Sequence, residues 1–220
     1  MELPEHLVVL APHPDDEVFG CGQLMANMRE AGKKVSIVYL TCGEGSHRNC
    51  CETEEKEIAQ ARTNLAEKAC EISNCDGEQI WAGIIDGDIN SERDEKRIEE
   101  IVREIHNRDK VDAIAAPHRF EGWKDHENTY LIGKNVAQTM RLPFYEYCVW
   151  FWFSMPYSKM LKCKWKDVKF VRGFADTKEE AAKVYLTEKG PCGKPWSGVL
   201  PKIFVDANLG KRELFFGNQI

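Results

Sequence analysis

The sequence predicts an α/β protein with a Rossmann-like, mostly parallel sheet and helices on both faces, in three αβα layers. Over the first two-thirds of the chain, short apolar runs alternate with longer segments of helical periodicity. The 220 residues, 43% of them hydrophobic, can bury one sizeable core. We therefore expect a single domain over residues 1–220, with a core at about residues 5–155 and a C-terminal capping region at about residues 156–220.

The expected strands are short runs of apolar and β-branched residues that end at turn residues. They cover residues 7–11, 34–41, 79–84, 111–116 and 166–172. The expected helices place apolar residues at a period of about 3.6. They cover residues 17–30, 54–72, 92–108, 125–140 and 178–187. Gly32 closes the first helix and Pro117 ends the fourth strand, because glycine permits a left-handed helix end and proline removes a ladder donor.

Two later segments carry expectations of their own. Residues 144–153 are the most aromatic run and are apolar on both faces at period two, which predicts a strand buried on both sides. The glycines and prolines of residues 190–198 predict a loop suited to capping a pocket. We expect Trp196, within this loop, to pack on its own domain.

Composition excludes several classes of protein. The formal charge of −6 disfavours nucleic acid as a partner. No stretch reaches the roughly 18 apolar residues of a spanning helix, and no signal-peptide pattern is present, so we expect no integral membrane segment and a cytoplasmic location. A dinucleotide site is not expected either, because no Gly-x-Gly-x-x-Gly follows the first strand.

Nine cysteines occur without a Cys-x-x-Cys pair. This pattern predicts neither a thiol zinc knuckle nor a thioredoxin-like motif, and we expect reduced, mostly buried thiols. Cys50 and Cys51 lie in a polar loop and are expected to be the most exposed and oxidisable thiols. The neighbouring His47 and Arg48 are expected to be solvated loop residues.

The chemistry is concentrated in residues 11–17, Ala-Pro-His-Pro-Asp-Asp-Glu, between the first strand and the first helix. Such a turn lies at the carboxyl edge of an open α/β sheet, where ligands bind. His13 and Asp16 are three residues apart and can face one point, with donor atoms that suit zinc. Asp15 must project differently, which frees it to act as a base. Acidic first turns also occur on many helices that bind no ligand, because negative charge stabilises the helix N-terminus. That interpretation, however, explains neither the histidine nor the two prolines.

Three further blocks follow in order: Thr41-Cys42-Gly43-Glu44-Gly45, Asp86-Gly87-Asp88-Ile89 and Asp125-His126. Together with residues 11–17 and the following Gly20-Cys21-Gly22, they resemble the PIG-L/LmbE family of zinc-dependent N-deacetylases. Members of that family remove acetyl groups from N-acetylglucosamine-type sugars and related conjugates. The resemblance extends through most of the chain and implies the same fold and reaction here.

The resemblance implies a role for each matching residue. His13, Asp16 and His126 would hold Zn²⁺, although Fe²⁺ or Co²⁺ fits the same donors. Asp15 would be the general base of catalysis, and Asp125, the carboxylate beside His126 in the sequence, would support the site from outside the metal's own ligand set.

Two more residues would bind the substrate. Arg62 falls where the family carries an arginine that faces substrate, although an arginine on a charged helix is usually solvated. Asp86 would line the sugar site and accept hydrogen bonds from hydroxyl groups, although Asp-Gly is also a common turn signal.

One position departs from the family pattern. The histidine three residues before the ligand histidine, which would stabilise the oxyanion or protonate the amine, is replaced by Trp123. An indole cannot shuttle a proton at neutral pH, so Trp123 is expected to contact substrate only. We expect His118 to take the catalytic role; the alternatives are a metal that works with less help, or an impaired protein.

The sequence therefore predicts a metal-dependent hydrolase of linear amide C–N bonds. Its substrate would be a small N-acetyl sugar or glycoconjugate, and its products acetate and a free amine. Two alternatives stay open: a related amidase that acts on a thiol conjugate or a non-sugar amide, and a non-catalytic sugar-binding α/β domain. The sugar, its carrier and the formation of a homo-oligomer also stay open.

Overall fold

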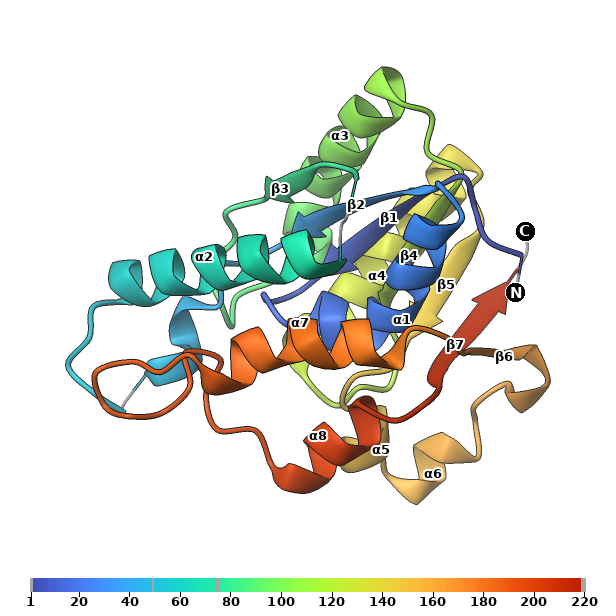
Figure 1. Ribbon diagram of the computed structural model, residues 1–220. Helices are drawn as coiled ribbons and strands as arrows, with labels where there is room; N and C mark the ends of the chain where they lie inside the picture. The colour runs from blue at the N-terminus through green and yellow to red at the C-terminus, as the bar shows by residue number, and fades with distance from the viewer. Residues whose placement is uncertain (1, 49, 74–75, 219–220) are drawn as a thin grey trace.

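The computed structural model describes residues 2–48, 50–73 and 76–218, and its described strands form one seven-stranded sheet (Figure 1). The strands are β1 (His6–Ala11), β2 (Lys34–Tyr39), β3 (Gln79–Trp81), β4 (Ala113–Pro117), β5 (Phe144–Tyr147), β6 (Val168–Val171) and β7 (Glu213–Asn218). Their order is β3-β2-β1-β4-β5-β7-β6. The first five strands pair in parallel, and β7 pairs antiparallel with both β5 and β6. The prediction of a mostly parallel sheet is confirmed.

Helices cover both faces of the sheet, as predicted. They are α1 (Asp16–Glu30), α2 (Glu55–Ser73), α3 (Ser91–Arg108), α4 (Lys124–Met140), α5 (Phe151–Ser154), α6 (Tyr157–Met160), α7 (Ala175–Thr187) and α8 (Lys202–Asn208), with 3₁₀ turns η1 (Glu44–His47) and η2 (Trp165–Asp167). Figure 1 shows α1, α2 and α7 in front of the sheet, where they share one apolar core, and α3 and α4 behind it, where they share another. Across the described residues, every helix is too short or too polar to span a membrane.

The topology explains why the site lies where it does. From β1 the chain moves outward to β2 and β3, and then returns to the other side of β1 as β4. The order of strands therefore reverses between β1 and β4, and ligands bind at the carboxyl ends of the strands beside such a switch point. All six residues of β1 are buried, so its end places the following turn over the centre of the sheet.

Two glycines let other elements approach α1 closely. A Cβ atom at Gly20 would lie 2.2 Å from the ring of Tyr147, and one at Gly22 would lie 2.7 Å from the side chain of Lys178. Both positions therefore require glycine. Close packing therefore explains the two glycines of the Gly20-Cys21-Gly22 block. The ring of Tyr147 is held beside Gly20, because its hydroxyl donates to Leu10 O of β1 at 2.8 Å.

The prediction for residues 144–153 is wrong beyond Tyr147. The strand β5 ends there, and the chain turns into α5, where the side chains of Trp152 and Phe153 are 50% and 51% exposed. The cause is the buried Glu121, whose carboxylate accepts the backbone N–H groups of Val149 and Trp150. A side chain from another segment thus satisfies the donors that a continued strand would have given to its neighbour.

The C-terminal region supplies two strands of the sheet. The predicted strand at 166–172 and helix at 178–187 are observed as β6 and α7, whereas β7 was not predicted. A buried ion pair joins α7 to β7: Lys178 Nζ lies 2.9 Å from Glu213 Oε1. Lys178 also donates to Phe19 O at 2.7 Å, and Glu213 accepts the N–H groups of Gln23 and Leu24.

We expect Lys178→Met to lower the free energy of unfolding by about 3–5 kcal/mol, because it leaves the carboxylate of Glu213 buried and unpaired. Urea denaturation would measure the change. The double variant Lys178→Met/Glu213→Gln should recover part of the loss, since glutamine removes the uncompensated charge. A single variant as stable as the wild type would show that the pair does not hold α7 and β7 to α1.

Candidate active site

An open pocket of about 390 Å³ lies at the carboxyl edge of the sheet. Its walls come from the segments that follow each of the strands β1 to β5, from Arg62 on α2, and from the loop between α7 and α8. The pocket contains His13, Asp15, Asp16 and His126 from the predicted site. The switch point of the sheet and the predicted motif therefore coincide.

Two of the predicted residues converge on one carboxylate oxygen of a third, Asp16. His13 Nδ1 lies 3.1 Å from Asp16 Oδ2, and His126 Nε2 lies 3.3 Å from the same oxygen. Asp16 and His126 are 2% and 1% exposed. The turn fixes this arrangement, because the backbone N–H of His13 also donates to Asp16 Oδ2 at 3.0 Å.

These donors fit a divalent metal ion. Two imidazole nitrogens and one carboxylate oxygen form a common ligand set of catalytic zinc. Donor atoms of His13, Asp16 and His126 lie within 4.8 Å of one another. Burial opposes ionisation of Asp16, but the adjacent His126 and His13 outweigh it and lower the pKa of Asp16, which keeps its carboxylate charged.

Asp15 is held apart from these three residues. Its φ of 124° lies in a region that L-residues rarely adopt, and its carboxylate points to Arg62, with Nη2 at 3.1 Å from Oδ2. Burial raises the pKa of Asp15 to about 7, although Arg62 opposes the shift. Gly43, with φ 67°, makes room for this pair, because a Cβ there would lie 2.6 Å from the Arg62 guanidinium. Arg62 thus lies in the site and holds Asp15.

Glu17 and Tyr185 complete the turn and were not predicted as site residues. Glu17 Oε2 accepts the N–H of Asp15 at 2.9 Å, and Tyr185 on α7 donates its hydroxyl hydrogen to Glu17 Oε1 at 2.5 Å. Burial raises the pKa of Glu17 to about 7. The motif contains Glu17, but nothing in the sequence connects it to a tyrosine 168 residues away.

Asp86 and Asp125 both contact His13. Asp86 Oδ1 lies 3.2 Å from His13 Nε2, and Asp125 Oδ2 lies 3.4 Å from the same nitrogen. Asp86 also accepts the N–H of Gly45, and Asp125 that of Gly87, so each carboxylate ties a loop to His13. Asp125 thus contacts His13 from outside the three predicted metal ligands, and its expected supporting role stays a prediction.

A second carboxylate, that of Glu121, lies beside His126. Glu121 Oε2 lies 3.5 Å from His126 Nδ1, and Glu121 is fully buried. A carboxylate on the far nitrogen of a ligand histidine fixes its ring orientation and leaves the other nitrogen for a metal. Sequence reasoning missed Glu121 because it lies in an irregular loop with no motif spacing to His126.

The structure does not bring His118 to the pocket, which corrects its expected catalytic role. Its ring is 1% exposed and packs against the rings of Phe120, Phe151 and Phe216. Burial, with a contribution from Arg119, lowers the pKa of His118 to about 3. A neutral, enclosed imidazole cannot deliver a proton at neutral pH.

Trp123, by contrast, lies where the sequence indicated. It precedes α4, lines the pocket and is 52% exposed, with Trp150 of the same pocket 5.6 Å away between ring centroids. Two indole rings at the rim offer flat apolar surfaces to a ligand.

Fold and site together define a three-layer α/β protein with a histidine and carboxylate centre at its switch point. A family model described as GlcNAc-PI de-N-acetylase, PIG-L, matches residues 8–137, well over half of the chain. The chain therefore belongs to the PIG-L family. No curated protein gives a significant match to the sequence.

Solved structures share the fold at low sequence identity. The zinc-inhibited form of teicoplanin deacetylase Orf2 has a TM-score of 0.68 and 12% identity, covering 96% of this chain and 97% of that one. N,N'-diacetylchitobiose deacetylase from Pyrococcus horikoshii has a TM-score of 0.62 and 16% identity, covering 86% and 72%. GalB, a 4-carboxy-2-hydroxymuconate hydratase from Pseudomonas putida, has a TM-score of 0.67 and 17% identity, covering 97% and 95%.

We expect His118→Gln to remove part of the acid sensitivity of the fold. The unfolded chain binds a proton on His118 below pH of about 6.5, whereas the folded chain resists it down to a pKa of about 3. The stabilisation that neutral His118 contributes is complete above a pH of about 6.5. It decreases as the pH falls below that value, by up to about 1.4 kcal/mol per pH unit.

Urea unfolding of both proteins at pH 7 and pH 5 would measure the difference. The wild type should lose more stability than His118→Gln between these two conditions. Turnover at neutral pH should change far less than the roughly hundredfold loss expected for a missing oxyanion donor. A hundredfold loss in a folded variant would restore His118 to the catalytic machinery.

Proposed function

We propose that this protein is a metal-dependent N-deacetylase that hydrolyses the acetamide of an N-acetylated amino sugar or glycoconjugate. The observation that carries the proposal is the convergence of His13, Asp16 and His126 in one pocket with the separately held Asp15. The family description and the two deacetylase structures support it. The hydratase has the same fold, so the residues of the pocket, rather than the fold, carry the assignment.

The metal ligands would be His13, Asp16 and His126, with Zn²⁺ as the first choice and Fe²⁺ or Co²⁺ fitting the same donors. A metal ion bound there would supply a Lewis acid that activates water at neutral pH and polarises the substrate carbonyl. Glu121 orients His126, while Asp86 and Asp125 orient His13.

Asp15 acts as the general base. Its carboxylate takes the proton from the attacking water and, once protonated, can deliver it to the departing amine. Arg62 and Glu17 keep Asp15 in its strained conformation, so the base does not collapse onto the metal ligands. Trp123 and Trp150 would contact the face of the sugar ring at the rim of the pocket.

Amide hydrolysis balances simply: the C–N bond breaks, water supplies the hydroxyl of acetate, and the nitrogen leaves as a free amine. A related amidase would break the same bond in a thiol conjugate or a non-sugar amide. Release of acetate, compared with release of longer acyl groups from matched substrates, distinguishes these reactions. The cytoplasmic location stays a prediction from the sequence.

We expect Asp15→Asn to retain its metal and lose about 10²–10⁴-fold in turnover, because the amide cannot accept the proton from water. Acetate release from N-acetylated amino sugars, with metal content measured by mass spectrometry, would test this. Asp88→Asn, in an exposed ion pair of a neighbouring loop, is the matched control and should keep its turnover. A metal-loaded and fully active Asp15→Asn protein would refute the assigned role.

We expect His126→Ala to lose the metal of this site, since it removes one of three protein ligands. Metal analysis of protein purified without chelator would measure the loss. A wild-type protein that binds no metal at His126 even after added zinc, yet binds an N-acetyl sugar, would favour the non-catalytic sugar-binding domain.

A further inference from the structure

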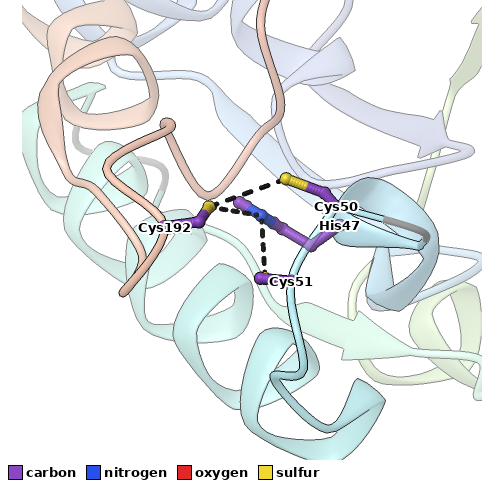
Figure 2. A group of neighbouring side chains, drawn as sticks. All are labelled: His47, Cys50, Cys51 and Cys192. Carbon is purple, nitrogen blue, oxygen red and sulfur yellow. Dashed lines mark hydrogen bonds between the residues drawn. The ribbon is translucent and has the colours of Figure 1, made fainter.

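A second group of metal-ligand side chains lies outside the residues assigned above. It comprises His47 at the end of η1, Cys50 and Cys51 just after it, and Cys192 from the loop between α7 and α8. Figure 2 shows the four side chains converging from two segments of the chain. Cys50 and Cys192 are 142 residues apart in sequence.

The distances within this group match those of a tetrahedral zinc site. His47 Nδ1 lies 3.4 Å from Cys192 Sγ and 3.8 Å from Cys51 Sγ, while Cys50 Sγ lies 3.6 Å from Cys192 Sγ. Zn–S bonds of about 2.3 Å and Zn–N bonds of about 2.0–2.1 Å place tetrahedral ligand atoms roughly 3.5–3.8 Å apart. All four ligand atoms lie within 4.8 Å of one another.

The orientation of His47 supports the same conclusion. Its Nε2 lies 3.0 Å from Pro195 O, and a carbonyl can only accept, so Nε2 carries the hydrogen. Nδ1 is then left with a free lone pair that faces the sulfur atoms. A ligand histidine that donates its other N–H to a backbone carbonyl is the usual arrangement around zinc.

The surroundings also differ from the expectation of a solvated loop. His47 is 2% exposed, and its ring packs edge-on against Trp196 at 5.4 Å between centroids. Three thiolates and a neutral imidazole leave a zinc site with a net charge of about −1, and Lys194, two residues after Cys192, would offset the excess.

We propose that His47, Cys50, Cys51 and Cys192 bind a structural Zn²⁺. Four protein ligands close the coordination shell, so the ion would stabilise structure and take no part in hydrolysis. It would clamp the loop between α7 and α8 onto the segment after β2. Both segments form pocket walls, through Ser46 and Ser197, so the clamp would set the shape of the substrate entrance.

The test uses reduced protein purified without chelator, its metal content measured by mass spectrometry and its zinc ligands by X-ray absorption. Cys192→Ser is the informative variant, because Cys192 is exposed and the change does not disturb a core. Cys163→Ser, at a cysteine outside the group, is the matched control. His126→Ala removes the catalytic site and isolates the second one.

We expect the wild type and Cys163→Ser to show sulfur neighbours at about 2.3 Å from zinc. His126→Ala should keep this signal, whether or not the proposed hydrolase function holds. Cys192→Ser should lose one zinc per chain together with the sulfur signal. Chelator should lower the melting temperature of His126→Ala, and the same treatment should not change that of the double variant His126→Ala/Cys192→Ser.

Three results would overturn the proposal. The first is zinc-loaded wild-type protein without sulfur neighbours around the zinc, and the second is a sulfur signal that stays the same in Cys192→Ser. The third is a Cys50–Cys192 disulfide in protein kept anaerobic throughout purification, which would make the pair a redox device instead. All three results are independent of the metal bound through His126.

Discussion

Three consecutive carboxylates at one turn set the central constraint on this structure. Asp15, Asp16 and Glu17 are all buried, and each needs a different partner to avoid its neighbours. The positive φ of Asp15 turns its side chain to Arg62 on α2, while Asp16 meets His13 and His126, and Glu17 meets Tyr185 on α7. Strain of this kind costs on the order of 1–3 kcal/mol and persists only where the surroundings overdetermine the conformation. The turn therefore orders α2, α4 and α7 around itself.

The same constraint shapes the electrostatics of the pocket. His13 is contacted by Asp16, Asp86 and Asp125, and these carboxylates outweigh burial and raise the pKa of His13. The carboxylates gathered there exceed the cationic groups beside them, which suits a divalent cation. The backbone N–H groups of Gly45 and Gly87 donate hydrogen bonds to Asp86 and Asp125, and so offset part of this negative charge from the loops.

Local patterns predicted most of the fold, because periodicity reports burial of one strand or one helix face. The pair His13 and Asp16 could be predicted for a similar reason, since a spacing of three residues at a helix start places the two side chains on the same side. Contacts between distant segments could not be predicted, because they depend on tertiary packing. Examples are Glu121 beside His126, Tyr185 beside Glu17, and the pairing of strand β7. His118 failed as a candidate because sequence proximity to His126 says nothing about which side of a loop a ring faces.

The buried pair of Lys178 and Glu213 has a consequence for how the protein is made. Glu213 accepts hydrogen bonds from the backbone of α1, 190 residues earlier in the chain. At a synthesis rate of roughly 5–20 residues per second, Glu213 is synthesised about 10–40 s after α1. The helix α1, which begins at Asp16, is thus synthesised among the first elements and completed among the last. During this interval the nascent chain exposes the apolar faces that α7 and β7 later cover.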